Sequence, residues 1–411
     1  MSTLQRPAIA ELANPKTLPD PYPVLAGLRE ASPFADFDGA LVVVGRHADC
    51  SGVLRHPNAS SERGKSLLAP VNRRRRERPS FLSLDPPDHT RLRGLVSKAF
   101  TPRTIARLEP RIRAITRELL SAAAVAGQLE VVSQLAYPLP VRIISELLGV
   151  PVEDHPRFAG WSARLANSLQ PGFGVPVEEA QARAEAADIA SEEFAVYFRE
   201  LIGLRRAQPQ PDLLSGMIAA EVQGEKLTED ELIATCVLLL VAGHETTVGL
   251  ISNAILALLR HPDQLALLQA HPELAAAAVE ETLRFDAPVQ LTGRVARGGL
   301  RVGGVTAREG AVVMLLLAAT GRDPDVFAEP DRFDIQRGAS NHLAFAAGPH
   351  FCLGAPLARL EATIALGEVA RRVVAPELAA DGLSYKPNMN LRGPDRLLVD
   401  FAEIISPAAA G

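Results

Sequence analysis

The chain has 411 residues, of which 47% are hydrophobic and 22% are charged, and its formal net charge is −5. This composition excludes a disordered, collagen-like or coiled-coil protein, and a pI near 6.0 provides no overall positive charge for binding nucleic acid. The three cysteines, Cys50, Cys236 and Cys352, are too few and too widely spaced for a disulfide framework, so we expect a reducing compartment.

The N-terminal segment lacks the pattern of a targeting sequence. Its first 23 residues contain five prolines and no apolar block, which predicts neither a signal peptide nor a membrane anchor. The most apolar segment, Cys236 to Gly243, is far shorter than the roughly 20 residues that span a bilayer. We therefore expect a cytoplasmic protein.

The first half of the chain is predicted to be mostly helical. A helix at 24–30 and a strand at 41–44 precede a loop at about 60–87 that is rich in proline and arginine. The basic run from Arg73 to Arg78 in this loop is interpreted as solvated, with an anion-binding patch as the alternative. Helical patterns dominate from 89 to 201, with proline breaks and an exposed loop at 170–176.

The second half is organised around one long helix. Thr228-Glu-Asp-Glu231 has the form of a capping box, and no proline follows until Pro262. This predicts a helix of about 33 residues that is apolar on most faces and therefore runs through the core. Further helices are predicted at 262–270, 272–285 and 353–373, strands at 289–295, 300–302 and 311–317, and a long irregular stretch at 321–354.

Cys352 lies in a glycine-rich turn just before the last predicted helix. Backbone N–H groups at a helix N-terminus stabilise a thiolate and lower its pKa, so the position predicts a nucleophile or a metal ligand. Gly348 and Gly354 would allow a tight turn and the close approach of a flat, bulky group.

The segment from Phe345 to Gly354 resembles the haem-binding loop of the cytochrome P450 family, Phe-Gly/Ser-x-Gly-x-His/Arg-x-Cys-x-Gly, with Gly348, His350 and Cys352 in register. The resemblance implies that Cys352 is the thiolate ligand of the iron of haem b (iron protoporphyrin IX). It also implies that Phe345 packs near the sulfur and that His350 reaches a haem propionate. Ala346 departs from the family's glycine or serine.

A second resemblance lies in the long helix, where Ala242-Gly-His-Glu-Thr246 matches the family's Ala/Gly-Gly-x-Asp/Glu-Thr. In the family this segment lies over the distal face of the haem, where the helix is locally opened. The match implies that Ala242 and Gly243 leave room for dioxygen beside the cofactor. It also implies that Glu245 and Thr246 are the catalytic residues, which organise the water that delivers protons. His244 is outside the pattern and receives no role.

Two further sets of residues match the family in sequence order. Glu281 and Arg284 form its Glu-x-x-Arg pair, and Arg332 is our candidate for the arginine that completes this structural triad. The resemblance also implies that cationic side chains bind the two haem propionates, since buried anions need charged donors. In addition to His350, these donors are His89, Arg93 and Arg294.

The resemblance implies a mainly α fold with a smaller β region, in which haem lies between the long central helix and the cysteine loop with its C-terminal helix. We expect a single cytochrome P450 domain over 1–411, with a β-rich lobe from about 24–60 and 289–320. The implied activity is that of a soluble bacterial haem-thiolate monooxygenase that activates O₂ and hydroxylates or epoxidises a lipophilic small molecule.

No flavin or nicotinamide domain is visible in the sequence, so a ferredoxin with its NAD(P)H-dependent ferredoxin reductase is the implied electron donor. It is expected to dock on the cysteine side, with charge from Arg103, Arg107, Arg111 and Arg113. Substrate contacts are expected from the loops at 60–84 and 170–176 and from a mostly apolar set of residues. These residues are Leu239, Leu240, Val289, Gln290 and Leu291.

Other functions remain open at this stage. A peroxide-driven or non-oxidative haem-thiolate enzyme is one alternative, although Glu245 and Thr246 favour activation of O₂. A haem-binding sensor without turnover is another. A thiol hydrolase that uses Cys352 and His350 is disfavoured, because residues so close together in a tight turn seldom give the required geometry and no orienting third group is found.

Overall fold

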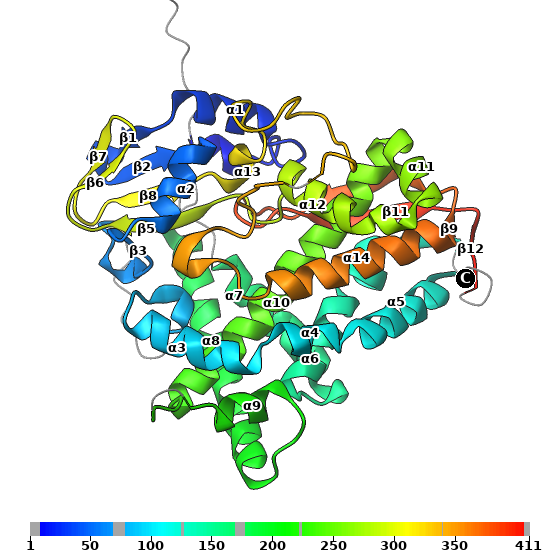
Figure 1. Cartoon of the computed structure of the whole chain (residues 1–411), viewed down its shortest axis with the longest axis horizontal. Coiled ribbons are helices and arrows are strands. Elements are labelled where there is room, and N and C mark those ends of the chain that lie inside the picture. Colours follow the sequence, from blue (N-terminus) through cyan, green and yellow to red (C-terminus); the bar gives the residue numbers. More distant parts are fainter. Residues whose placement is uncertain are drawn as a thin grey trace, which may run out of the picture.

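The computed structural model describes residues 9–68, 79–124, 127–168, 177–221, 224–338 and 340–406. Helices make up most of the molecule, and small sheets lie on one side of it and behind the helices (Figure 1). The predicted mainly α class is therefore confirmed. The basic run from Arg73 to Arg78 and the loop at 170–176 lie outside the described residues.

The central element is α10, Glu229–Arg260, which packs against α6, α8, α12 and α14. The predicted capping box is confirmed: the Thr228 hydroxyl accepts from the Glu231 N–H, and the Glu231 carboxylate accepts from the Thr228 N–H. Every residue from Thr247 to Leu258 is buried. A helix that is buried on all sides needs mostly apolar residues on all faces, which explains why only Thr247, Ser252 and Asn253 are polar in this stretch.

The sequence analysis took 236–243 as the most apolar segment, but the apolar stretch of α10 is longer. By length and composition alone, this helix could cross a membrane. Its most apolar 18-residue window, however, is 67% buried inside the fold. Burial against other helices of the same chain is what a core helix of this composition requires.

The remaining α-helices are α1 (Tyr22–Ala31), α2 (His47–Arg55), α3 (Asp88–Ala99), α4 (Pro102–Ala106), α5 (Glu109–Ala123), α6 (Pro138–Leu148), α7 (His155–Asn167), α8 (Val177–Ala207), α9 (Leu213–Ala219), α11 (Pro262–Ala270), α12 (Ala275–Phe285), α13 (Leu317–Thr320) and α14 (Ala355–Arg372). Some of them lie around α10, and α1, α2 and α13 lie beside the large sheet (Figure 1). The helix predicted at 272–285 is shorter, because Pro272–Leu274 forms a 3₁₀ turn.

The largest sheet has the order β1-β2-β8-β5-β3, with β2 and β8 parallel and the other pairs antiparallel. Its strands are β1 (Phe34–Asp36), β2 (Leu41–Val44), β3 (Ala59–Ser60), β5 (Thr292–Ala296) and β8 (Val312–Leu315). The two ranges expected to form a β-rich lobe supply all five. β5 starts three residues later than predicted, because Val289 makes only an isolated bridge to Leu391.

A second sheet, β10-β11-β4, is absent from the sequence prediction. It joins β10 (Glu377–Tyr385) and β11 (Pro394–Asp400) to β4 (Gln128–Glu130), which interrupts a region predicted to be helical. Two antiparallel pairs are found in addition: the hairpin of β6 (Leu300–Val302) with β7 (Val305–Ala307), and the non-consecutive pair of β9 (Val373–Val374) with β12 (Glu403–Ile404).

Candidate functional site

The cysteine loop is a closed turn that leads into α14. The N–H of Cys352 donates to the carbonyl of Phe345 at 3.0 Å, and the N–H of Phe351 donates to that of Gly348, also at 3.0 Å. Gly348 has a φ of +69°, and a Cβ there would collide with the carbonyl of Leu54 in α2. A glycine is therefore required at this point of the loop, both by conformation and by space.

Cys352 is the exposed cysteine, whereas Cys50 and Cys236 are buried. Although the thiol is accessible, protein atoms surround it on most sides, and this burial raises its pKa. The backbone around Gly354 and Ala355 and the charges of Arg93 and Arg359 act in the opposite direction. The expectation of a lowered pKa was wrong, because desolvation outweighs the stabilisation of the thiolate at the helix N-terminus. A bound cation at the sulfur would reverse this balance.

Four predicted cationic residues converge above the cysteine loop. The rings of His89 and His350 lie 4.1 Å apart, Arg93 donates to the carbonyl of Phe351 at 2.5 Å, and Arg294 lines a pocket together with His350. Burial, His89 and Arg294 lower the pKa of His350 to about 3. Burial and nearby Arg63 lower the pKa of Arg294 to about 10.

This cluster fits an anionic group. Both ring nitrogens of the buried His89 and the hydroxyl of the buried Ser61 have no hydrogen-bond partner among the described residues. Buried polar groups are normally paired, and buried cations need anions. The pocket that Ser61, Arg63, Arg294 and His350 help to line therefore offers donors suited to a ligand that carries carboxylates. Sequence reasoning missed Ser61 and Arg63, because both lie in the irregular loop after β3 and match no motif.

The Ala242 to Thr246 segment lies within α10, which is continuous through it. The Thr246 hydroxyl donates to the Ala242 carbonyl at 3.1 Å, so the expected local opening of the helix is not seen here. Ala242 is exposed. Gly243 instead faces α6: a Cβ there would lie 3.1 Å from Cγ1 of Ile144. The small size of Gly243 therefore serves the contact between α10 and α6, and its expected role in leaving room for dioxygen stays a prediction.

Glu245 is held between two basic side chains. Its Oε2 lies 3.4 Å from Nζ of Lys386, which follows β10, and its Oε1 lies 3.5 Å from Nε2 of His244. Burial raises the pKa of Glu245, but His244 and Lys386 outweigh burial and hold this pKa at about 2. The carboxylate is therefore ionised at neutral pH.

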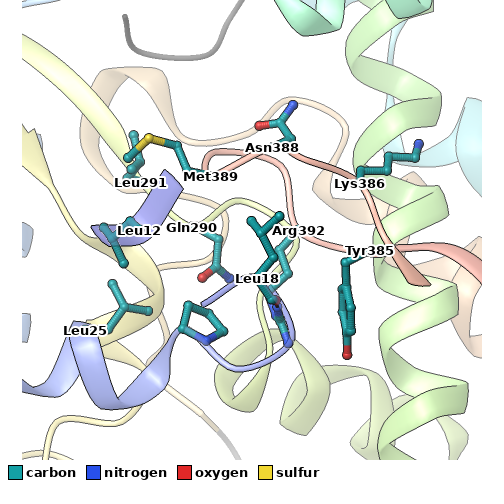
Figure 2. Close-up of a pocket in the computed structure, with 12 residues that line it drawn as sticks. Leu12, Leu18, Leu25, Gln290, Leu291, Tyr385, Lys386, Asn388, Met389 and Arg392 are labelled. Carbon is teal, nitrogen blue, oxygen red and sulfur yellow. The ribbon is translucent and has the colours of Figure 1, made fainter. Parts of the chain in front are cut away.

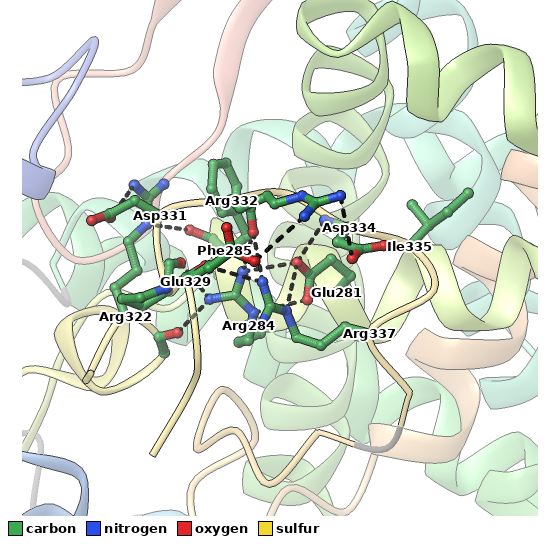
Figure 3. Close-up of polar contacts among 12 residues, drawn as sticks. Glu281, Arg284, Phe285, Arg322, Glu329, Asp331, Arg332, Asp334, Ile335 and Arg337 are labelled. Atoms are coloured by element: carbon green, nitrogen blue, oxygen red, sulfur yellow. Dashed lines mark hydrogen bonds and ion pairs between the residues drawn. The ribbon is translucent and has the colours of Figure 1, made fainter. Parts of the chain in front are cut away.

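Glu281 and Arg284 form a fully buried, bidentate ion pair on α12, with both N–O distances at 2.8 Å (Figure 3). Arg284 also donates to the carbonyls of Gly321, Pro330 and Arg332 at 2.7 to 2.9 Å. Glu281 accepts from the N–H of Asp334 at 2.9 Å. The pair therefore fixes the irregular chain between α13 and the cysteine loop.

Arg332 is not the third arginine of this network. Its side chain is 57% exposed and lies 3.4 Å from Glu329, and only its carbonyl reaches Arg284. Arg337 takes the predicted place: its Nε lies 3.2 Å from Glu281, and it donates to three carbonyls of the same stretch. Both arginines lie in a segment without periodicity, so motif spacing alone selected the wrong one (Figure 3).

A neighbouring network, which the sequence did not reveal, holds Phe345. Arg359 of α14 forms a bidentate pair with Glu280 of α12 at 2.6 and 3.0 Å, and its guanidinium lies 4.5 Å from the centre of the Phe345 ring. His342 lies 3.2 Å from Glu280. Burial raises the pKa of Glu280, but His342 and Arg359 hold it at about 2.

The predicted substrate residues do not form one surface. Leu239 and Leu240 are buried in the core around α10, and Val289 packs beside the core of the large sheet. Gln290 and Leu291 line a different pocket, beside the N-terminal segment and the hairpin between β10 and β11 (Figure 2). Gln290 donates its amide to the Ala287 carbonyl, and Leu291 packs among residues near the N-terminus. The structure therefore does not bring these two residues to the pocket at His350.

The four arginines expected on the cysteine side differ in their surroundings. Arg111 forms a bidentate pair with Glu146 at 2.6 and 2.8 Å. Arg113 lies 2.9 Å from Glu109 and 3.2 Å from Glu368. Arg103 and Arg107 are exposed on and just after α4, which packs against α14.

Known proteins are similar to this chain over nearly its whole length. The Cytochrome P450 family matches residues 177–373. A Vitamin D(3) 25-hydroxylase of Pseudonocardia autotrophica is 39% identical over 92% of this chain and 93% of its own. The structure of ligand-free CYP164A2 of Mycobacterium smegmatis has a TM-score of 0.88 and 48% sequence identity. The match covers 95% of this chain and 98% of that chain. A third match, with a TM-score of 0.87 and 37% identity, is the structure of P450BioI in complex with a hexadec-9Z-enoic acid ligated acyl carrier protein. This match covers 94% of this chain and 99% of that chain.

Proposed function

The chain belongs to the cytochrome P450 family of monooxygenases, and from this membership we propose that it binds haem b through Cys352 and oxidises a lipophilic small molecule with O₂. The observation that carries the proposal is that the loop of Cys352 lies beside Arg93, Arg294 and two histidines. Of these, the buried His89 has no hydrogen-bond partner for either ring nitrogen among the described residues. Haem with a cysteine ligand supplies the activation of O₂ and the cleavage of its O–O bond.

The chain's own residues would then have the following roles. His89, Arg93, Arg294 and His350 bind the two propionates, and Phe345 and Gly354 shape the turn around the sulfur. Ala242 borders the distal side. Glu245 and the hydroxyl of Thr246 organise the water that delivers protons. The buried network of Glu281, Arg284 and Arg337 keeps the cysteine loop in place.

We propose that a ferredoxin, reduced by an NAD(P)H-dependent ferredoxin reductase, supplies the electrons in the cytoplasm. It would dock beside Cys352, where Phe351 is 42% exposed and Arg103 and Arg107 present positive charge. Arg107→Ala should weaken binding of an acidic ferredoxin and reduce its salt dependence. Arg111→Ala is the matched control, since Glu146 already neutralises that charge. Equal effects of the two substitutions would contradict this docking site.

The proposed substrate class rests on the relatives. One relative is named for hydroxylation of vitamin D(3), and another was solved with a fatty acid on its carrier protein. We propose a substrate of similar lipophilic character. A panel of sterols, free fatty acids and acyl carrier protein thioesters, tested for a spin-state shift in the haem spectrum, would identify the class. No shift with any member would contradict it.

The central experiment is the spectrum of the reduced protein with carbon monoxide. Haem-loaded wild type should show the thiolate Soret band after which the family is named, Cys352→Ala should lack it, and Cys236→Ala should retain it. Product formation should require NAD(P)H, ferredoxin and reductase. Turnover with peroxide alone would favour the peroxide-driven alternative, and a haem spectrum without any turnover would favour a sensor.

A further inference from the structure

His244, which the family pattern leaves without a role, is buried next to Glu245. Its Nδ1 lies 2.7 Å from the carbonyl oxygen of Leu240, one turn earlier in α10. A carbonyl oxygen can only accept a hydrogen bond, so Nδ1 carries a proton. The ring is fixed from the other side by Tyr137, whose ring meets it edge-on at 5.8 Å.

The second ring nitrogen faces the carboxylate. Nε2 of His244 lies 3.5 Å from Oε1 of Glu245, and it is buried with no hydrogen-bond partner at ordinary distance among the described residues. If Nε2 carried no proton, its lone pair would face a negatively charged oxygen in a buried site, and this repulsion would be costly. A proton on Nε2 converts the same contact into a charge-assisted interaction.

Charged groups on the neighbouring elements support one shared proton. Lys386, from the hairpin after β10, holds Oε2 of Glu245 and leaves Oε1 for His244. Tyr137 before α6 is the remaining titratable side chain that the described part of the chain places in electrostatic contact with Glu245. Burial and the charge of Glu245 raise the pKa of Tyr137 to about 12, so it stays neutral. Lys386 is thus a cation at one oxygen of the carboxylate, and Nε2 of His244 faces the other oxygen.

We propose that His244 is a positioning residue that stores a proton for Glu245, with the proton moving between Nε2 of the imidazole and Oε1 of the carboxylate. When Glu245 takes it, the Nε2–H bond breaks, an O–H bond forms, and the imidazole becomes the neutral Nδ1–H tautomer. The bond from Nδ1 to Leu240 is unchanged by the transfer, and Lys386 keeps the carboxylate in place. The inference deepens the proposed function, on which it rests for the use of the stored proton.

Nitrogen-15 NMR of the histidine-labelled, haem-loaded chain in its diamagnetic ferrous carbon monoxide form tests the proton directly. His244→Asn assigns the signal. At pH 7 both ring nitrogens should be protonated in the wild type, and Glu245→Gln should convert the ring to the neutral Nδ1–H tautomer. A neutral ring in the wild type, or a ring unaffected by Glu245→Gln, would overturn the proposal. This readout does not depend on turnover, so it separates failure of the proposal from failure of the proposed function.

A pH profile of product formation tests the role of the stored proton. His244→Asn should lower the rate by about tenfold or more and shift the profile, which is the order expected for loss of a group that assists proton transfer. His261→Asn is the matched control: its Nδ1 lies 2.7 Å from the Ala257 carbonyl and its ring meets Phe285 edge-on at 5.8 Å. Should His244→Asn fail to fold, Lys386→Met, which frees the carboxylate, should shift the same profile. An unshifted profile in the folded variant would overturn the proposal.

Discussion

Replacing Arg337 by methionine should destabilise the protein much more than the same replacement of Arg332. Arg337 is 16% exposed, and it contacts Glu281 and three main-chain carbonyls at 2.6 to 3.2 Å. Removal of one member of a buried ion pair costs about 3–5 kcal/mol, but Glu281 keeps Arg284 as a partner, so we expect about 2–4 kcal/mol. Arg332 is 57% exposed and its pairs are those of a surface residue, worth about 0–1 kcal/mol.

Scanning calorimetry at fixed pH and salt would measure the difference. An unfolding entropy of about 2.1 cal/mol/K per residue gives a chain of this size about 0.9 kcal/mol/K, so Arg337→Met should lower Tm by about 2–5 °C. Arg332→Met should lower it by about 1 °C or less. Since the network fixes the cysteine loop, Arg337→Met should also release haem faster. Equal shifts for the two variants would refute the assignment.

Three further outcomes follow from single contacts. Ala346 has a φ of +58°, so Ala346→Gly should stabilise the loop by about 1 kcal/mol; a lower Tm would contradict this. Thr228→Ala should cost about 1 kcal/mol through loss of the α10 cap, whereas Thr228→Ser should cost little. The pKa of Glu280 is lowered from 4.5 to about 2. Its contribution to the stability of the fold is therefore present above pH 4.5 and is lost as the pH falls towards 2. The Tm difference between wild type and Glu280→Gln should shrink over that range; a constant difference would refute the assignment.

The parts of the fold that the sequence predicted carry local signals. The start of α10 has a capping box, its end has His261-Pro262, and the strand at 41–44 has four consecutive apolar residues. β4 has no such signal. Its three residues form a strand because they pair with Leu398 to Asp400, about 270 positions later, and a non-local pairing leaves no pattern in either segment.

In the candidate site too, residues with a local sequence signal were predicted and residues placed by non-local contacts were not. Cys352, His350 and Glu281 were singled out because motifs fix their spacing. The structure places Glu281 in a buried ion-pair network and the ring of His350 4.1 Å from that of His89. Arg337 was missed because the chain from 321 to 354 has no period that could distinguish it from Arg332. The contact of Gly243 with Ile144 could not be predicted, because the motif gives a position on the helix, whereas this contact depends on how α6 crosses α10.

Carboxylates on two regular helices bind side chains of segments that lie outside those helices. Glu281 of α12 binds the stretch that contains Arg337, its neighbour Glu280 binds His342 and Arg359 around Phe345, and Glu245 of α10 binds Lys386 at the C-terminal hairpin. The irregular chain has few backbone hydrogen bonds to lose, so its position depends on these charge-assisted contacts. Removing such a carboxylate should therefore leave the helix intact and displace the segment bound to it. For Glu280 and Glu281, that segment leads to the loop of Cys352. For Glu245, it is the hairpin between β10 and β11 that carries Lys386.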